Sequence, residues 1–294
     1  NNWFLFSVPS PGADVTFDAN SAANLTIDLG ADISVNKLTL VDPVGPVTLF
    51  NFSLILGAGG LDMAGAVQDL DLQSSLVLSG PQNWNVAAGR QVTVGGPLTN
   101  TAGVAWNLDG EGLVRFTNTY LGALGLVKNG GATLELAGNK NFSGGVTING
   151  GTLRVNAGGW YVNPFSQFNV VTVQTGATLR TSGAHSLGVD QNTIILNEGT
   201  LSLGAENYIS ALQLNGGTVT NGELRTWGGV MPIGASTNGG FVYSTFTLVG
   251  DATLQVADGA AETDLTLAGN VQGGAGLTKT GPGTLAVAGV TTYG

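Results

Sequence analysis

The chain has 294 residues, enough for one or two compact domains or for one elongated repeat domain. Its 48 glycines lack the every-third spacing of collagen, and a composition of 43% hydrophobic and only 10% charged residues excludes a disordered linker. The net charge of −10, the scattered basic residues and the absence of cysteine argue against nucleic-acid partners and exclude disulfides and thiol chemistry. No run reaches the roughly 18 apolar residues of a membrane-spanning helix, so we expect no membrane insertion by this segment.

Residues 1–12 combine three aromatic side chains, Trp3, Phe4 and Phe6, with two prolines. Aromatic and proline-rich ends suit a cap over the first strand of a sheet, which would otherwise expose unpaired backbone groups. We expect residues 1–12 to form such an amino-terminal cap. Because the chain does not begin with Met, we also expect the natural polypeptide to be longer.

Apolar residues alternate with polar ones through the first hundred residues. A period of two indicates short strands with one buried face. Asp69 and Asp71 fall on one outer face by the same alternation, which makes them weak candidates for a calcium site. A solvated outer face explains this pair equally well. The alternating pairs are Val15/Phe17, Ile27/Leu29, Leu38/Leu40, Leu76/Leu78 and Val92/Val94.

Residues 125–143 and 276–294 align without gaps. Such an ungapped match indicates an internal repeat. Lys128 and Lys279 recur at one register, which suggests a structural role beside a strand. The eight identical pairs among 19 are Gly125/Gly276, Leu126/Leu277, Lys128/Lys279, Gly130/Gly281, Thr133/Thr284, Leu134/Leu285, Ala137/Ala288 and Gly138/Gly289.

A shorter unit recurs more often, namely a glycine-containing turn followed by Thr and an alternating apolar pair. Steps of 18–26 residues between these threonines suit one coil each, and the steps of 35 and 31 residues suit one coil plus an excursion, or two short coils. The threonines are Thr133, Thr152, Thr178, Thr200, Thr218, Thr253 and Thr284.

Two arrangements of these strands are open. The Asn-Gly turns at 149–150 and 215–216 permit tight hairpins, and hairpins predict an antiparallel meander or sandwich. In a β-helix the same glycines bend the chain between two faces, and each strand pairs with its equivalent one coil later. The repeat steps favour the β-helix.

Two segments break the rhythm, residues 157–169 and 221–247. Excursions from a solenoid often carry its binding function, and exposed aromatic rings can stack on sugars or anchor a partner. Rings that fold back over a lateral face are the simpler explanation, which we favour. The binding candidates are Trp160, Tyr161, Phe165, Trp227 and Tyr243.

His185 is the only histidine, and no Gly-x-Ser-x-Gly motif or Walker pattern occurs. A metal site would need carboxylate partners that the sequence does not place near His185. We expect a surface or corner histidine, no catalytic residues and no cofactor.

The motif Gly-Leu-x-Lys-x-Gly-x-x-Thr-Leu at 125–134 and 276–285, followed by Gly-Gly-Val-Thr-Ile-Asn-Gly-Gly-Thr-Leu-Arg-Val-Asn-Ala at 144–157, resembles the autotransporter-associated β-strand repeat. The clearest stretches are 125–157 and 276–294, and the resemblance is weak before residue 120. It implies right-handed β-helix coils, export and surface display in bacteria. It carries no catalytic residues that transfer to this chain.

We therefore predict an all-β chain, a single continuous right-handed parallel β-helix of about a dozen coils over residues 1–294, as part of a longer chain or assembly. The predicted function is that of a non-catalytic, extracellular structural or adhesive surface protein, a stalk or filament subunit. Expected partners are further β-helix coils or other copies end to end, and a glycan or host-surface ligand. The alternatives are a polysaccharide-active β-helix lyase or hydrolase and a carbohydrate-binding module.

Overall fold

A computed structural model describes residues 8–21, 24–100, 105–118, 120–122, 125–137, 140–142, 145–156, 170–187, 193–209 and 211–293. The chain divides into two compact units, Asn1–Gly138 (unit 1) and Asn139–Gly294 (unit 2). Over the described ranges, both units consist of strands joined by turns, and no helix is present.

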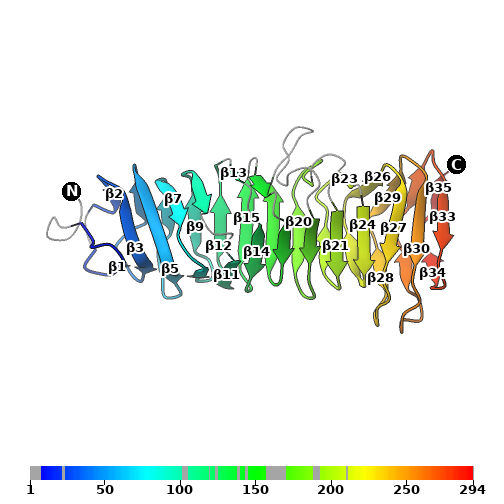
Figure 1. Cartoon of the computed structure of the whole chain (residues 1–294), viewed down its shortest axis with the longest axis horizontal. Helices are drawn as coiled ribbons and strands as arrows, with labels where there is room; N and C mark the ends of the chain where they lie inside the picture. The colour runs from blue at the N-terminus through cyan, green and yellow to red at the C-terminus, as the bar shows by residue number, and fades with distance from the viewer. Residues whose placement is uncertain are drawn as a thin grey trace. The chain divides into compact units, whose positions relative to one another are not determined.

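Unit 1 contains two sheets of parallel strands, and its strands are coloured blue to green in Figure 1. The β1 sheet follows the order β1 (Ala13–Phe17), β3 (Ile33–Leu40), β5 (Ser53–Met63), β8 (Gln82–Val86), β11 (Ala105–Gly110) and β14 (Leu126–Asn129), with β7 (Ser75–Leu78) between β5 and β10 (Leu98–Asn100). The β2 sheet contains β2 (Thr26–Asp28), β4 (Val47–Phe50), β6 (Leu70–Leu72), β9 (Gln91–Val94), β12 (Leu113–Phe116) and β15 (Thr133–Ala137), and β13 (Tyr120–Gly122) is a further strand. The chain passes repeatedly from one sheet to the other, although β7 and β8, like β10 and β11, are consecutive strands of the same sheet.

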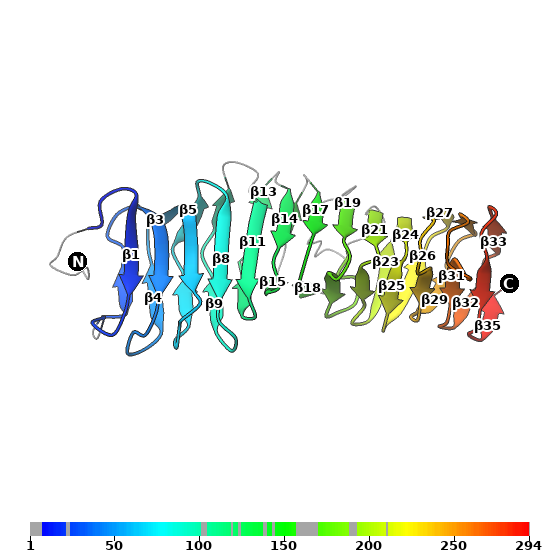
Figure 2. The same cartoon turned by 90° about the horizontal axis from the view of Figure 1, so that it is seen from below.

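Unit 2 has three parallel sheets, and Figure 2 shows the third of them with β23, β26, β29 and β32 as neighbours. The β17 sheet contains β17 (Val146–Ile148), β19 (Val170–Val173), β21 (Thr193–Asn197), β24 (Ala211–Asn215), β27 (Gly229–Ile233), β30 (Ala252–Val256) and β33 (Leu277–Thr280). The β18 sheet contains β18 (Thr152–Asn156), β20 (Thr178–Thr181), β22 (Thr200–Ser202), β25 (Gly217–Thr220), β28 (Gly240–Val242), β31 (Leu265–Leu267) and β34 (Leu285–Val287). The β23 sheet contains β23 (Glu206–Ile209), β26 (Glu223–Thr226), β29 (Thr245–Leu248), β32 (Val271–Gly273) and β35 (Thr291–Tyr293), and β16 (Lys140–Phe142) is a further strand.

The threonine–leucine strands stack directly on one another in unit 2. Leu153 pairs with Leu179, and Leu179 pairs with Leu201, all in parallel register. These three side chains are fully buried, whereas the threonines before them stay partly exposed. Alternation therefore places one apolar column inside the coils and one polar column outside. The predicted parallel β-helix is confirmed, and the antiparallel meander is excluded for these strands.

Aromatic rings fill part of the interior of unit 1. The Trp84 and Trp106 rings stack with centroids 5.8 Å apart, and Phe116 stacks on Trp106 at 5.2 Å. All three side chains are buried, and the indole Nε1 of Trp84 donates a hydrogen bond to Gln82 Oε1 at 2.9 Å. Rings of this size bury large apolar areas, and offset stacking adds to their stabilisation.

The repeated Lys-x-Gly motif forms a corner of the coil. The Lys128 Nζ donates to the Gly130 carbonyl at 3.1 Å, and the Lys279 Nζ donates to Gly281 at 2.8 Å. A Cβ added at Gly130, whose φ is +71°, would lie 1.8 Å from the Leu108 carbonyl oxygen. The recurrence of this lysine and glycine thus has a structural cause, although Lys128 and Lys279 lie within strands, β14 and β33, and not beside them.

The structure corrects two details of the predicted coil rhythm. Thr253 lies in β30 of the β17 sheet, whereas Thr218 lies in β25 of the β18 sheet, so the apparent step of 35 residues joins different faces. The coil equivalent of Thr218 is Phe241. Residues 221–247 are also not one excursion, because they contribute β26 to β29 and only 234–239 form a longer connection between strands.

Three predictions about organisation stay predictions. Residues 1–7 of the expected cap and residues 157–169 of the other expected excursion lie outside the described residues. The continuity of a single coil from unit 1 into unit 2 is also left as predicted.

Candidate binding surface

A stack of three rings lies along one corner of unit 2. The rings of His185 and Tyr208 have centroids 5.4 Å apart, and Tyr208 stacks on Trp227 at 5.2 Å with an interplanar angle of 21°. His185 and Tyr208 are almost completely buried, but Trp227 is 49% exposed. The two inner rings therefore support an outer indole that solvent can reach.

Arg225 lies beside this stack and connects two carboxylates. Its guanidinium Nη2 lies 2.7 Å from Glu206 Oε2, and its Nε lies 2.8 Å from Glu223 Oε1. It also donates to the Tyr208 hydroxyl at 2.9 Å, and its Cζ lies 5.5 Å from the centroid of that ring. The His185 Nε2 lies 3.3 Å from Glu206 Oε1. Charge-assisted contacts of this kind fix the side chains in one orientation.

The register of two strands assembles these groups. In the parallel pair β23–β26, Glu206 lies next to Glu223 and Tyr208 lies next to Arg225. All four side chains point away from the interior because they occupy alternate positions of their strands. The outward row continues from Arg225 to Thr247 of β29, whose hydroxyl donates to Glu223 at 2.6 Å.

Electrostatics keep Glu223 ionised. Its partial burial alone would raise the pKa of the carboxyl, but hydrogen bonds from Arg225 and Thr247 and the charge of Arg225 hold that pKa below its usual value. Hydrogen bonds to Glu223 and Tyr208 raise the pKa of Arg225 in turn. Two carboxylates thus face one guanidinium, and Glu223 does not donate a proton at neutral pH.

A buried asparagine anchors the turn that carries His185. The Asn207 Nδ2 donates to the carbonyls of Gly183 and Ala205 and to Thr181 Oγ1, and its Oδ1 accepts from the Leu187 N–H at 3.2 Å. The His185 N–H donates to the Glu206 carbonyl at 2.9 Å. This turn therefore covers the first edge of the β23 sheet, which would otherwise be unpaired.

Two glycines allow close backbone packing around Trp227. Gly228 has a φ of +108°, and a Cβ there would lie 2.5 Å from the Asp251 carbonyl oxygen. A Cβ at Gly250, in the next coil, would lie 2.0 Å from the Trp227 carbonyl oxygen. Close backbone packing thus requires glycine at both positions, and neither contributes a side chain beside Trp227.

The predicted binding residues are distributed over different places. Trp227 is part of the ring stack, whereas Tyr243 follows β28, is 55% exposed and stacks on Phe241 at 5.9 Å. Trp160, Tyr161 and Phe165 lie outside the described residues. His185 does occupy a turn, as expected, but is buried there rather than at the surface.

Sequence reasoning missed the groups around Trp227. The signal that could have found them is a repeat of spacing, because Glu206 precedes Tyr208 by two residues just as Glu223 precedes Arg225. In stacked parallel strands, this spacing places both acids in one row and the ring and the guanidinium in another.

The carboxylates of Asp69 and Asp71 already have protein partners. Asp69 Oδ1 accepts from the Gln91 N–H at 3.0 Å and lies 3.6 Å from Arg90 Nη1, and Asp71 Oδ1 accepts from Gln73 at 2.7 Å. Among the described residues, no group of three or more histidine, cysteine, aspartate or glutamate side chains has an arrangement that could hold a metal ion. The calcium site stays a weak prediction.

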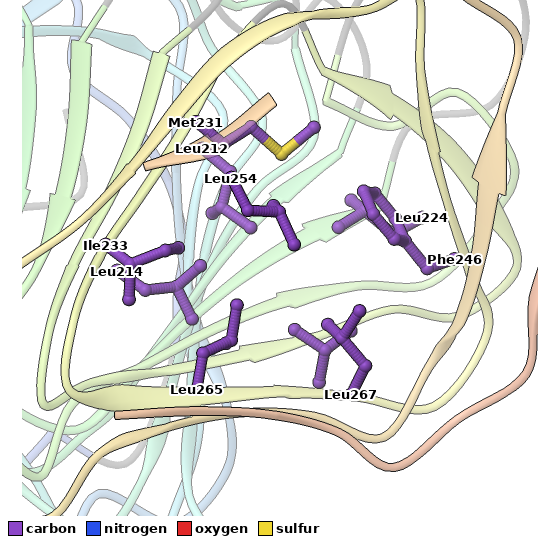
Figure 3. A pocket seen from close by; sticks show the side chains of 10 residues that line it. Leu212, Leu214, Leu224, Met231, Ile233, Phe246, Leu254, Leu265 and Leu267 are labelled. Carbon is purple, nitrogen blue, oxygen red and sulfur yellow. The ribbon is translucent and has the colours of Figure 1, made fainter. Parts of the chain in front are cut away.

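One space inside the coils of unit 2 is too small and too apolar to suit a ligand. Figure 3 shows ten apolar side chains around a small space inside the coils, including Leu214, Met231 and Leu254. The centre of a water molecule could occupy only about 10 Å³ of that space, and apolar cavities of this kind stay dry. Over the described ranges, the chain also lacks any helix with the length and hydrophobicity needed to span a bilayer.

Comparisons with known proteins agree with this architecture. The passenger-associated-transport-repeat family matches residues 126–155 and 277–294, which confirms the resemblance seen in the sequence. The chain is also 27% identical over 348 aligned positions to the adhesin BmaC autotransporter of Brucella suis biovar 1 (strain 1330). That alignment covers 95% of this chain but only 10% of the adhesin. No solved structure matches the chain significantly.

Proposed function

Because the chain carries passenger-associated-transport repeats, we propose that it is a bacterial surface-exposed or secreted protein with a structural and adhesive role. The β-solenoid is the shaft in this proposal, and its lateral faces present the groups that contact other molecules. Further β-helix coils or second copies of the chain are the structural partners, and a glycan or another host-surface molecule is the ligand. The similarity to an adhesin supports the adhesive part.

The observation that carries the proposal is the in-register parallel pairing of successive coils over apolar inner columns. Thr178, Thr200 and Thr218 follow one another in a continuous row of one sheet. Each coil is hydrogen-bonded to its neighbours on both sides, which stabilises a repeat protein without any disulfide. Such a scaffold suits exposure outside the cell.

The charge network supports binding rather than hydrolysis. A glycoside hydrolase needs one carboxyl whose pKa is raised so that it can protonate the leaving group. The pKa of Glu223 is lowered instead, and Arg225 bridges this carboxylate to Glu206. Glu223 is therefore unsuited to the role of proton donor in glycoside cleavage.

A bead assay tests the adhesive role. Beads coated with the chain are counted on epithelial cell monolayers, with albumin-coated beads as the control, and we expect several times more of the former to stay bound after washing. Equal numbers would reject adhesion. Antibodies against the chain should also label intact cells of the bacterium that makes it, and labelling only after permeabilisation would reject exposure at the surface.

A further inference from the structure

We propose that the corner of unit 2 at Trp227 binds a neutral sugar ring, which stacks on the exposed indole and forms hydrogen bonds with Arg225 and its two carboxylate partners. This inference rests on the proposed adhesive function and names the class of ligand. It concerns only the groups of the ring stack and of the Arg225 network.

The indole is held in place before any ligand arrives. Tyr208 packs against Trp227 at a centroid distance of 5.2 Å and is itself supported by His185 at 5.4 Å. Because both supporting rings are buried, the indole loses little further freedom when a ligand binds. The Trp227 side chain is 49% exposed, so part of the indole is accessible to a ligand.

The polar groups beside the indole match a polyhydroxylated ligand. A sugar ring has apolar C–H faces and hydroxyls that both donate and accept hydrogen bonds. Arg225 supplies donors, while Glu206 and Glu223 supply acceptors, and all three side chains are 22–32% exposed. Their mutual ion pairs fix the directions of the remaining donors and acceptors, which gives orientational selectivity.

The sign of the charge excludes an acidic ligand. Two carboxylates share one guanidinium here, and the whole chain carries a net charge of −10. A sialylated or sulfated glycan would therefore be repelled. A cationic ligand gains little, because Arg225 already neutralises one of the two carboxylates.

The flat geometry of the site predicts weak binding of each single sugar. An exposed ring buries little of a ligand compared with an enclosed pocket. Many copies on a cell surface would compensate through multivalent contact with repeated sugars.

A glycan array followed by titration tests the proposal. The intact chain is applied to an array of neutral, sialylated and sulfated glycans, and the strongest neutral oligosaccharide is then titrated while the tryptophan fluorescence is recorded. We expect binding to neutral glycans that added salt hardly weakens, since screening affects only charged partners. Trp227→Ala should weaken the affinity about tenfold, and Trp227→Phe, which keeps a ring, about threefold or less.

Tyr243→Ala is the matched control. Tyr243 has a similar exposure and also stacks on one ring, but it follows β28 in a different sheet. We expect the Tyr243→Ala variant to bind the neutral oligosaccharide with the affinity of the unchanged chain. Circular dichroism should show that all variants are folded. Equal affinity of the Trp227→Ala variant, an equal loss in Tyr243→Ala, or binding confined to acidic glycans would overturn the proposal, as would the absence of any neutral glycan binding.

The bead assay separates this inference from the proposed function. If beads coated with the Trp227→Ala variant adhere as well as beads coated with the unchanged chain, the proposed adhesive function is retained and the proposed sugar site at Trp227 is rejected. If the chain binds neutral glycans through Trp227 but its beads do not adhere to cells, the site stands and the adhesive function is wrong.

Discussion

At the scale of single residues, the least expected feature is a lysine inside the coils. Lys128 points inward from β14, where alternation places apolar side chains, and it is fully buried. Its ammonium donates hydrogen bonds to the Gly130 carbonyl at 3.1 Å and to the Asn129 carbonyl at 3.5 Å. Burial nevertheless lowers the pKa of Lys128 to about 8, because the charged form loses its hydration.

This pKa predicts a rise of stability with pH. The unfolded chain, with a lysine pKa near 10.5, holds more protons than the folded chain between pH 8 and pH 10.5, so the free energy of unfolding increases across that window. Burial of the charged ammonium lowers the free energy of unfolding by roughly 3 kcal/mol, and this loss is fully present below pH 8. Lys128→Met should remove this rise in urea unfolding curves recorded across the window.

Lys279→Met provides the matched control for that measurement. Lys279 occupies the equivalent position of the repeat and donates to Gly281, but it is exposed. Its variant should keep the pH dependence of the unchanged chain. Parallel pH profiles for the unchanged chain and Lys128→Met would show that the buried ammonium does not titrate in this range.

Which side chains face inward was predictable from the sequence, but side-chain contacts between coils were not. Leu153, Val155 and Leu201 are buried as their alternation predicted. The environment of His185 depends on Tyr208, a ring 23 residues later in the chain. Only the register of the coils brings the two rings together, and a local pattern carries no signal for such a contact.

At the scale of elements, the third sheet of unit 2 is the feature that positions the candidate site. Its first strand, β23, has one edge covered by the turn that Asn207 holds. The side chain of Asn207 is fully buried, so each hydrogen bond that it makes replaces one that water can no longer supply.

Asn207→Ala should loosen this turn and the start of the β23 sheet. The substitution leaves the Leu187 N–H and the Gly183 and Ala205 carbonyls without their side-chain partner, at a cost of about 2–4 kcal/mol. Hydrogen exchange measured by mass spectrometry should show faster exchange in residues 182–187 and 206–209.

Gln213→Ala is the comparison for that experiment. Gln213 lies in β24 of the same unit, points outward and donates one side-chain hydrogen bond, to Asn215 at 3.1 Å. Its exchange pattern should match that of the unchanged chain. Unaltered exchange at 182–187 in Asn207→Ala would show that the backbone contacts of this turn suffice without the asparagine.

The two-sheet coil was predictable at this scale, whereas the third sheet was not. Strands such as β18 and β22 are predicted by a glycine turn, a threonine and the alternating leucines or valines that follow. Three strands of the β23 sheet, β23, β26 and β32, have a polar residue or glycine at an inward position (Asn207, Thr226 and Gly273), so the apolar alternation that indicates a strand is broken in them. Residues 221–247 were therefore interpreted as an excursion although they contain two of these strands.

At the scale of the whole molecule, stability is expected to be a sum of contacts between neighbouring coils. In the β18 sheet of unit 2, Leu201 pairs with Leu179 on one side and Val219 on the other. A one-dimensional array of this kind transmits a local defect to the adjacent repeats and progressively less to distant ones. Disulfides, which would spread the effect, are absent because the chain has no cysteine.

Leu201→Ala should therefore unfold unit 2 locally before it affects unit 1. Removing this fully buried side chain leaves a cavity and costs about 2–5 kcal/mol. Hydrogen exchange should accelerate in β20, β22 and β25, while β3 and β5 of unit 1 keep their protection. Ser202→Ala, which changes the neighbouring outward position, should leave all of these strands protected. Equal acceleration in both units would mean that the chain unfolds as one cooperative block, and the nearest-neighbour description would then fail.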